Sequence, residues 1–388
     1  MQLIRNTKYL LFPAIGLSII ALIISYLSTN MNISLTGEKT VLKYWNAFTD
    51  WITAGRDNAP SDDVVFINVA HDKQLVDIAD DFGIPIGNAA ITDRQTLSKL
   101  LDLINESGEY QYVMLDVFFE SGYETEVDSV LFGRIASMDR LVIPKHIDGD
   151  LESKCLELKA GYADYATSIN ENDFTKYLLF RDGGASMPLK AYTEVTGRGV
   201  KRVLLWYADN GKLARRVIFP KMYVRMDSPY RPDGQKAYLN LGSDILDTEE
   251  EVDWSDYFKG KYIVIGSFAG DDIHTTYAGD LPGSLINYNV YLSLKKGQHK
   301  IPFVLVLVYF LIFFAMAYLL LNGGANASQS WTWVWAKLFV LYSLILTIVC
   351  IFVFVIWGQA HDIFITSTFF SIVDLVNRRI KAKKESHA

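Results

Sequence analysis

The sequence is poor in cysteine. Cys155 and Cys350 are the only two, and Cys350 lies inside a long apolar run, whereas Cys155 lies in a polar segment. The two thiols are therefore not expected to meet in a disulfide bond. One cysteine in the polar segment does not indicate whether its compartment is oxidising or reducing.

Several catalytic signatures are also lacking. The chain has no G-x-S-x-G and no H-E-x-x-H motif, which rules out recognition as a serine hydrolase or a zinc peptidase by motif. It also lacks the complete P-loop and the complete G-x-G-x-x-G fingerprint of nucleotide-binding proteins. We therefore expect no enzyme, and the sequence indicates no particular cofactor. A hydrolase that uses Asp72 and His274 is kept as an alternative.

A basic excess is absent from the long polar segment. The whole chain has a net charge of -7, and residues 30–300 hold 41 of the 44 acidic residues but only 29 of the 37 basic residues. Nucleic-acid binding requires a basic face, so we expect no nucleic-acid partner. The acidic balance is compatible with binding cations, and it also keeps a domain soluble.

Long apolar runs, by contrast, are present at both ends. Residues 9–27, 302–321 and 338–357 contain no charged residue and are each long enough to cross a hydrocarbon core of ~30 Å. No small-x-small cleavage pattern follows the first run, which favours an uncleaved anchor over a signal peptide. A fourth run, about 362–377, is shorter and contains Asp374. It is either a last span, with Asp374 near the inner boundary, or an interfacial helix.

Positive charges flank these runs and predict their orientation. Arg5 and Lys8 precede the first run, and a basic tail that includes Arg378 and Arg379 follows the last. Basic residues stay on the cytoplasmic side, so both termini are expected in the cytoplasm, with four spans and the polar segment outside. The predicted regions are a first span with its cytoplasmic N-terminus (1–29), an outer domain (30–300), three closing spans (301–377) and a basic tail (378–388).

The outer segment alternates between predicted strands and helices. Its strand candidates are continuous apolar runs, as in sheets that are buried on both faces. Amphipathic helices are predicted between them and after the last, which predicts an α/β fold with a mostly parallel sheet flanked by helices. The strands are expected at 64–70, 112–119, 140–147 and 261–269, the helices at 92–108, 127–138 and 283–294. Further strands are expected at 176–180, 201–208 and 214–224, and a juxtamembrane helix within 32–60.

Polar side chains follow several of these strands. In parallel sheets, ligands gather at the carboxyl ends of the strands. We therefore expect a ligand or cation pocket at that edge, lined by Asp72, Arg94, Asp116, Asp271, Asp272 and His274. Two alternatives remain. Asp116 and Arg94 would form a structural ion pair, or the Asp271, Asp272 and His274 cluster would bind a metal ion.

The order of these segments resembles the CHASE type-two family (cyclases/histidine kinases associated sensory extracellular). The resemblance rests on VVFINVAHD (64–72), the helix-opening Arg94, YVMLDVFF (112–119), KGKYIVIGSFAGDDIHTTYAG (259–279) and LPGSLINYNVYLSL (281–294). It covers nearly the whole chain, including an N-terminal anchor and three closing spans. The segment before Arg94 lacks the Trp-Pro-rich stretch often seen in the family.

The resemblance implies a sensory or regulatory subunit of a bacterial inner membrane. Its outer domain would lie in the periplasm, detect a ligand or an envelope component, and signal through the helices. Family members usually continue into a cytoplasmic output domain, whereas this chain ends about ten residues after its last predicted helix. A separate cytoplasmic effector is therefore expected, besides the lipid bilayer and a second copy in a homodimer. A scaffold or accessory protein of an envelope complex, which binds no ligand, is the main alternative.

Overall fold

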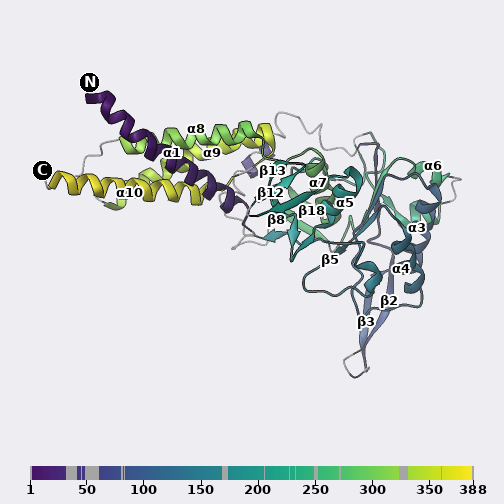
Figure 1. The fold of residues 1–388 in the computed structure, drawn as a ribbon. Helices are drawn as coiled ribbons and strands as arrows, with labels where there is room; N and C mark the ends of the chain where they lie inside the picture. Colours follow the sequence, from purple (N-terminus) through teal and green to yellow (C-terminus); the bar gives the residue numbers. More distant parts are fainter. Residues whose placement is uncertain are drawn as a thin grey trace.

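A computed structural model describes most of the chain. The described residues are 2–31, 42–44, 46–48, 61–79, 82, 84–167, 174–204, 206–226, 228–231, 233–248, 252–270, 272–322, 331–359 and 361–386. They form an elongated molecule with a helix bundle at one end and an α/β domain at the other (Figure 1). Most of the juxtamembrane helix expected within 32–60 lies outside the described residues.

The centre of the α/β domain is a sheet of six parallel strands, counted over the described residues, which confirms the predicted parallel α/β region. The strands, in spatial order, are β15 (Leu239–Asn240), β1 (Val64–Asn68), β16 (Tyr262–Gly266), β4 (Tyr112–Leu115), β5 (Leu141–Lys145) and β6 (Ala160–Tyr162). The three central strands are completely buried, as their continuous apolar sequences predict. Because all six run in one direction, their carboxyl ends meet at one edge.

Helices cover both faces of this sheet. One face packs against α3 (Arg94–Ser107), α4 (Asp128–Ser137) and α6 (Trp254–Phe258). The other packs against α5 (Met187–Thr196) and α7 (Gly283–Lys295). Alternate residues of each strand belong to opposite cores, because side chains along a strand point to opposite faces. In β1, for example, Val65 belongs to the first core and Phe66 to the second.

Smaller antiparallel elements surround the main sheet. A long hairpin of β2 (Lys73–Ala79) and β3 (Pro85–Thr92) projects from the domain (Figure 1). A second sheet runs in the order β14-β8-β17-β18, with β7 paired to β8. Its strands are β7 (Ala166–Thr167), β8 (Phe174–Leu178), β14 (Val217–Ile218), β17 (Ile273–Thr276) and β18 (Gly279–Pro282). A short pair consists of β9 (Phe180–Arg181) and β10 (Gly184–Ala185).

Two predictions for the middle region are wrong. Residues 201–208, predicted as one strand, form a hairpin of β11 (Val200–Val203) and β12 (Trp206–Asp209), which continues into β13 (Lys212–Ala214). Residues 214–224, also predicted as one strand, contain only the last residue of β13 and the short β14. A turn at Leu204, whose φ is 55°, divides the first segment into two strands. In the second segment, Phe219, Met222 and Val224 are buried in the core without pairing in a ladder. The helix α5 was not predicted.

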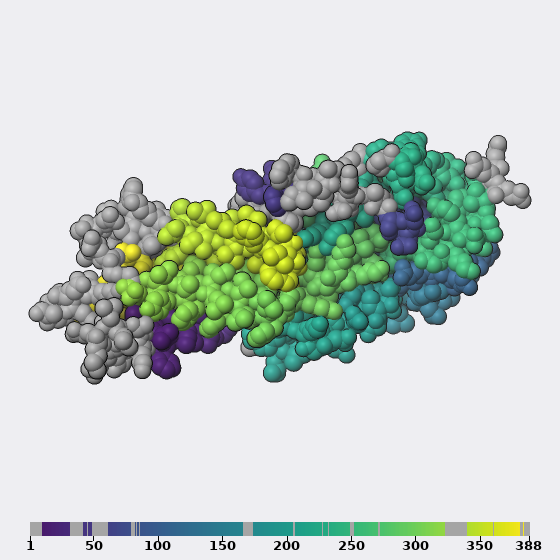
Figure 2. Space-filling model, turned by 90° about the horizontal axis from the view of Figure 1, so that it is seen from above, coloured from purple at the N-terminus to yellow at the C-terminus, as the bar shows by residue number. Residues whose placement is uncertain are grey.

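The helix bundle consists of α1 (Gln2–Thr29), α8 (Phe303–Asn322), α9 (Trp331–Trp357) and α10 (Phe364–Ser386). Among the described residues, three helices are long and apolar enough to cross a membrane, over Leu10–Thr29, Phe303–Asn322 and Val340–Trp357. All four helices share one apolar core. Figure 2 shows α8 in green and part of α9 in yellow continuing directly into the wider α/β domain.

The last helix is longer than expected. It continues through the basic segment to Ser386, and both chain ends lie at the end of the bundle that faces away from the α/β domain (Figure 1). Asp374 is buried and accepts a hydrogen bond from Arg378 Nε at 2.6 Å, one helical turn later. The pairing neutralises the one carboxylate inside the apolar part of α10, which lowers the cost of burying it.

Candidate functional site

A cavity of about 720 Å³ opens at the carboxyl edge of the parallel sheet. Residues that directly follow five strands line it: Val69 after β1, Asp116 after β4, His146 after β5, Ala163 after β6 and Ser267 after β16. The amino-terminal end of α7 and the base of the β2–β3 hairpin complete the wall. The cavity therefore lies where ligands bind in parallel α/β sheets.

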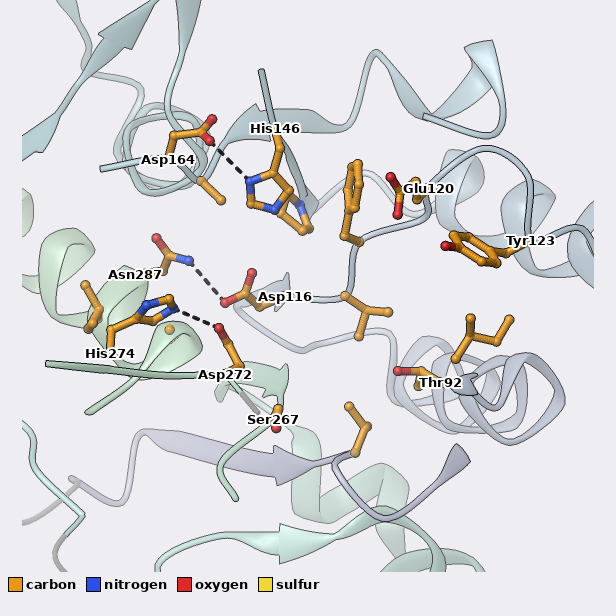
Figure 3. Close-up of a pocket in the computed structure, with 18 of the residues that line it drawn as sticks. Thr92, Asp116, Glu120, Tyr123, His146, Asp164, Ser267, Asp272, His274 and Asn287 are labelled. Atoms are coloured by element: carbon orange, nitrogen blue, oxygen red, sulfur yellow. Dashed lines mark hydrogen bonds and ion pairs between the residues drawn. The ribbon is translucent and has the colours of Figure 1, made fainter. Parts of the chain in front are cut away.

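Asp116 lies in the middle of the polar wall (Figure 3). Its Oδ2 accepts a hydrogen bond from Asn287 Nδ2 on α7 at 3.1 Å. Burial of the carboxyl group, together with the negative charge of Asp272, raises the pKa of Asp116 to about 6. The carboxylate is therefore an unfavourable charge at this buried position beside Asp272, and a cation placed there would stabilise it.

A chain of three side chains lies beside Asp116. His274 on β17 contacts Asp272 Oδ1 through Nε2 at 2.9 Å and the Tyr165 hydroxyl through Nδ1 at 2.8 Å. The Tyr165 and His274 rings also pack edge to face. With one ring nitrogen against a carboxylate and the other against a hydroxyl, His274 is held in one orientation in the cavity wall (Figure 3).

A second histidine–carboxylate pair lies on the other side of Asp116. His146 Nδ1 is 3.4 Å from Asp164 Oδ1, and its ring packs edge to face on Phe118. The interaction with Asp164 raises the pKa of His146. The two pairs and Asp116 thus form one polar surface, to which β4, β5, the segment after β6, β17 and α7 all contribute (Figure 3).

A glycine at the start of α7 permits the close packing of this surface. A Cβ atom at Gly283 would lie 2.6 Å from Asp272 Oδ2. The Gly283 amide also donates a hydrogen bond to the Asp272 carbonyl oxygen at 3.0 Å. Only a residue without a side chain allows the Asp272 carboxylate to lie against the first turn of α7, where the helix dipole favours negative charge.

Arg94 lines the cavity but does not pair with Asp116, so the alternative of an Asp116–Arg94 ion pair is wrong. The Arg94 side chain is 2% exposed. Its guanidinium group lies 3.5 Å from Asp128 and 3.6 Å from Glu152, and it stacks over the Phe119 ring. It connects the start of α3 to the start of α4 and to the segment after β5. Arg94 therefore has a structural role, with partners that the sequence did not indicate.

Asp72 does not line the cavity. Its carboxylate lies against the backbone of Gly242, which donates a hydrogen bond to it, and burial raises the pKa of Asp72. Asp271, another predicted site residue, lies outside the described residues. Of the six predicted site residues, the structure thus brings Asp116, Asp272, His274 and Arg94 to one cavity.

Sequence reasoning missed His146, Asp164, Tyr165 and Asn287. His146 had a usable signal, because it closes the apolar run 140–147 and so lies at the carboxyl end of a predicted strand. Asn287 lies in the first turns of a predicted helix that follows a strand. Asp164 and Tyr165 had no such signal, because the short strand β6 before them was not predicted.

A metal centre receives no support from this geometry. In the part of the chain that the structure describes, no group of three or more His, Cys, Asp or Glu side chains has the geometry to hold a metal ion. The carboxylate of Asp272 is instead shared between His274 and the start of α7.

The comparisons with known proteins found no match. No family model matches the chain, and neither a curated protein nor a solved structure matches it. The resemblance to the CHASE type-two family is therefore neither confirmed nor rejected.

Proposed function

We propose that this chain is a membrane-anchored sensory subunit whose α/β domain binds a small ammonium-bearing solute. The bundle would span the membrane four times, with α10 as the last span and the α/β domain on the outer side. An effector at the basic end of α10 would receive the signal. The proposed orientation rests on the positive charges near both chain ends. The apolar lengths of three helices support a membrane-spanning bundle.

The observation that carries the ligand proposal is the pair of acidic residues at the cavity centre. Asp116 and Asp272 lie close enough for the charge of Asp272 to raise the pKa of Asp116. In the described residues, neither carboxylate forms an ion pair with a lysine or an arginine. Lys73 and Arg181 also line the cavity, so it presents both signs of charge. A small zwitterion such as an amino acid fits this wall as well as a simple amine.

The path from the cavity to the bundle supports a sensory role. Helix α7 begins at the cavity, where Asn287 contacts Asp116, and ends at Lys295. A short connection leads from there into α8, and the backbone amide of Ile301 in that connection donates to the carbonyl of Leu213 on β13. A ligand that displaces Asn287 from Asp116 would shift a helix that is directly linked to a bundle helix. Its effect is limited to its difference in affinity for the two positions.

The test is a calorimetric titration of the full chain in lipid nanodiscs with simple amines, polyamines and amino acids. We expect one class to bind, and Asp116→Asn to weaken this binding by 10-fold or more (about 1.4 kcal/mol or more) because it removes the charge that faces the ammonium group. Asp280→Asn is the matched control. Asp280 is an exposed aspartate on β18 that does not line the cavity, so this variant should bind as the wild type does.

The pH dependence of binding provides a second readout. Because the pKa of Asp116 is raised to about 6, the carboxylate is protonated below that pH and cannot pair with an ammonium group. Affinity should therefore fall as the pH is lowered through about 6, and this fall should be absent in Asp116→Asn. Failure of all three ligand classes to bind at pH 7.5 would refute the ligand proposal and favour a scaffold.

A hydrolase is the second candidate, and one observation favours it. His274 is oriented by Asp272 and Tyr165 as a general base would be, next to a carboxyl group whose pKa is about 6. In that case, esters, amides or phosphoesters would be cleaved by the full chain and not by His274→Ala. Turnover that His274→Ala abolishes while the fold is retained would replace the sensory proposal by this one.

A further inference from the structure

The β11–β12 hairpin carries an apolar surface at its turn. The side chains of Val203, Leu204 and Trp206 are 52%, 85% and 38% exposed. Val203 and Trp206 form the last pair of the hairpin ladder, so the exposed apolar residues are all at its tip. Three large apolar side chains at one turn are costly in water and indicate a contact with something apolar.

The backbone of the turn strengthens this point. Leu204 has a φ of 55°, a left-handed conformation that glycine and asparagine adopt far more readily than leucine. A glycine or an asparagine would therefore adopt this turn conformation at a lower cost in free energy. The local conformation therefore does not explain why a leucine, 85% exposed, occupies this position.

The tip is held at the end of a bundle helix. The Trp206 ring packs on Tyr26 near the end of α1, with ring centroids 4.9 Å apart. The Tyr26 hydroxyl donates to the carbonyl of Ala214 at 3.1 Å and accepts from the amide of Tyr207 at 3.3 Å. Because the apolar stretch of α1 ends at Thr29, Tyr26 marks the level at which α1 would leave the membrane. Tyrosine and tryptophan are enriched at that level.

An apolar groove of about 200 Å³ continues from the tip into the bundle. Trp206 forms part of its wall, and α1 and α8 supply most of the remainder, including Leu22 and Leu305. Behind the tip, Lys201 and Arg202 are exposed on β11. An apolar tip with cations just behind it matches the layers of a phospholipid surface, where acyl chains lie beneath anionic phosphates.

We propose that the tip of the β11–β12 hairpin inserts into the outer surface of the bilayer. Val203, Leu204 and Trp206 enter the upper acyl-chain region, and Lys201 and Arg202 face the lipid phosphates. The insertion holds the three-stranded sheet β11–β13 at a set depth beside α1 and α8. This proposal rests on the membrane placement of the bundle, but it is independent of the ligand proposed for the cavity.

The experiment places a fluorescent label on the full chain in nanodiscs that contain lipids with a spin-label quencher on the acyl chain. Cys155→Ser and Cys350→Ser remove the native thiols, and Leu204→Cys and, separately, Val203→Cys introduce the labelling site. Two positions are used so that the test survives if one variant fails to fold. Leu311→Cys on α8, 55% exposed, is the reference for lipid contact, and Leu158→Cys, 82% exposed beside the 3-10 helix Lys154–Leu156, is the reference for water.

We expect labels at 203 and 204 to lose most of their fluorescence when the quencher is near the head of the acyl chain, and less when it is near the chain end. The label at 311 should be quenched and the label at 158 should not. Quenching at 311 without quenching at 203 and 204 would overturn the proposal, as would a protein partner that protects the tip in nanodiscs. No quenching at 311 would overturn both this proposal and the membrane placement, whatever the cavity binds.

Discussion

Buried charge around Arg94 is compensated within one small cluster. The guanidinium group faces two carboxyl groups, those of Asp128 and Glu152, and all three side chains are less than 10% exposed. Burial, and next to it the hydrogen bond and charge of Asp128, raise the pKa of Glu152 from 4.5 to about 8. At neutral pH, Glu152 therefore keeps its proton, and the cluster holds one positive and one negative charge. A pair of this kind is far less costly to bury than an unpaired charge.

The titration of Glu152 predicts a pH dependence of stability. Because its pKa is raised in the folded state, the folded chain holds a proton that the unfolded chain releases. The contribution of Glu152 to stability is therefore complete below about pH 4.5 and is lost as the pH rises towards 8. Glu152→Gln keeps a neutral side chain at all pH values. The substitution should reduce the loss of unfolding free energy between low and high pH by about 1–3 kcal/mol. Thermal unfolding of the α/β domain in nanodiscs at several pH values measures this loss.

Glu126→Gln is the matched control for this prediction. Glu126 is exposed and lies two positions before Asp128, the first residue of α4. Its replacement should therefore leave the slope of stability against pH unchanged. If Glu152→Gln and the wild type lose stability in parallel between pH 5 and pH 8, the proposed protonation of Glu152 is wrong.

At the scale of elements, the position of α7 depends on the end of β16. A Cβ atom at Gly266 would lie 1.9 Å from Ser284 Oγ and 3.3 Å from the Cβ of Asp116. The absence of a side chain at Gly266 thus lets the first turn of α7 approach the sheet edge and place Asn287 against Asp116. The position of Asn287 in the cavity wall therefore depends on the close contact between Gly266 and Ser284.

Gly266→Ala should therefore push α7 away from the sheet. We expect a loss of about 1–3 kcal/mol in unfolding free energy, the usual cost of overpacking, together with weaker ligand binding in the cavity. Thermal unfolding and calorimetry measure the two effects. Gly133→Ala in the middle of α4 is the control, because no atom lies within 4 Å of its new Cβ and alanine favours a helix. Equal stability of Gly266→Ala and the wild type would contradict this reasoning.

The elements that were predicted correctly share one feature. The predictions match the observed bounds closely for β1, β16, α3 and α7. In each, a continuous apolar run or a helical spacing of apolar residues indicates which side chains are buried. The β2–β3 hairpin was missed because its apolar residues, such as Leu75 and Ile86, are exposed. Because these side chains do not pack in a core, the hairpin sequence has no regular alternation of apolar and polar residues from which strands could be predicted.

At the scale of the whole molecule, one tyrosine joins the bundle to the α/β domain. Tyr26 near the end of α1 bonds the backbone of β12 and of β13. Close by, Arg215 Nη2 donates to His361 Nε2 at 2.6 Å, and Ser25 Oγ lies 3.3 Å from His361 Nδ1. These contacts hold β11–β13 to α1 and to the segment before α10. The domain is therefore connected by hydrogen bonds to α1 and to the segment before α10, besides its chain connection to α8.

Tyr26→Phe tests this junction. Loss of the hydroxyl removes two hydrogen bonds of about 1 kcal/mol each and leaves the Tyr207 amide without that partner. Backbone hydrogen exchange in β12 and β13 should become several-fold faster, while exchange in β1 and β16 stays the same. Tyr318→Phe on α8 is the control, because no hydrogen bond of its hydroxyl occurs in the described structure. Unchanged exchange in β12 and β13 would show that the junction does not depend on Tyr26.

The sequence by itself determined where apolar segments would be buried. Hydropathy and periodicity predicted the helices long enough to span a membrane, the buried strands and the edge at which Asp116, Asp272 and His274 lie. These predictions succeed because burial is a property of each segment on its own. The expected resemblance to a sensory family stays a prediction.

The tertiary structure alone decided which polar groups meet. His274 contacts a tyrosine 109 positions away, and Asp116 contacts an asparagine 171 positions away. Arg94 faces Asp128 and Glu152 rather than Asp116. A polar side chain requires a partner once it is buried, but its own sequence context does not specify that partner. The choice follows from the packing of helices and strands, which brings distant segments to the same edge of the sheet.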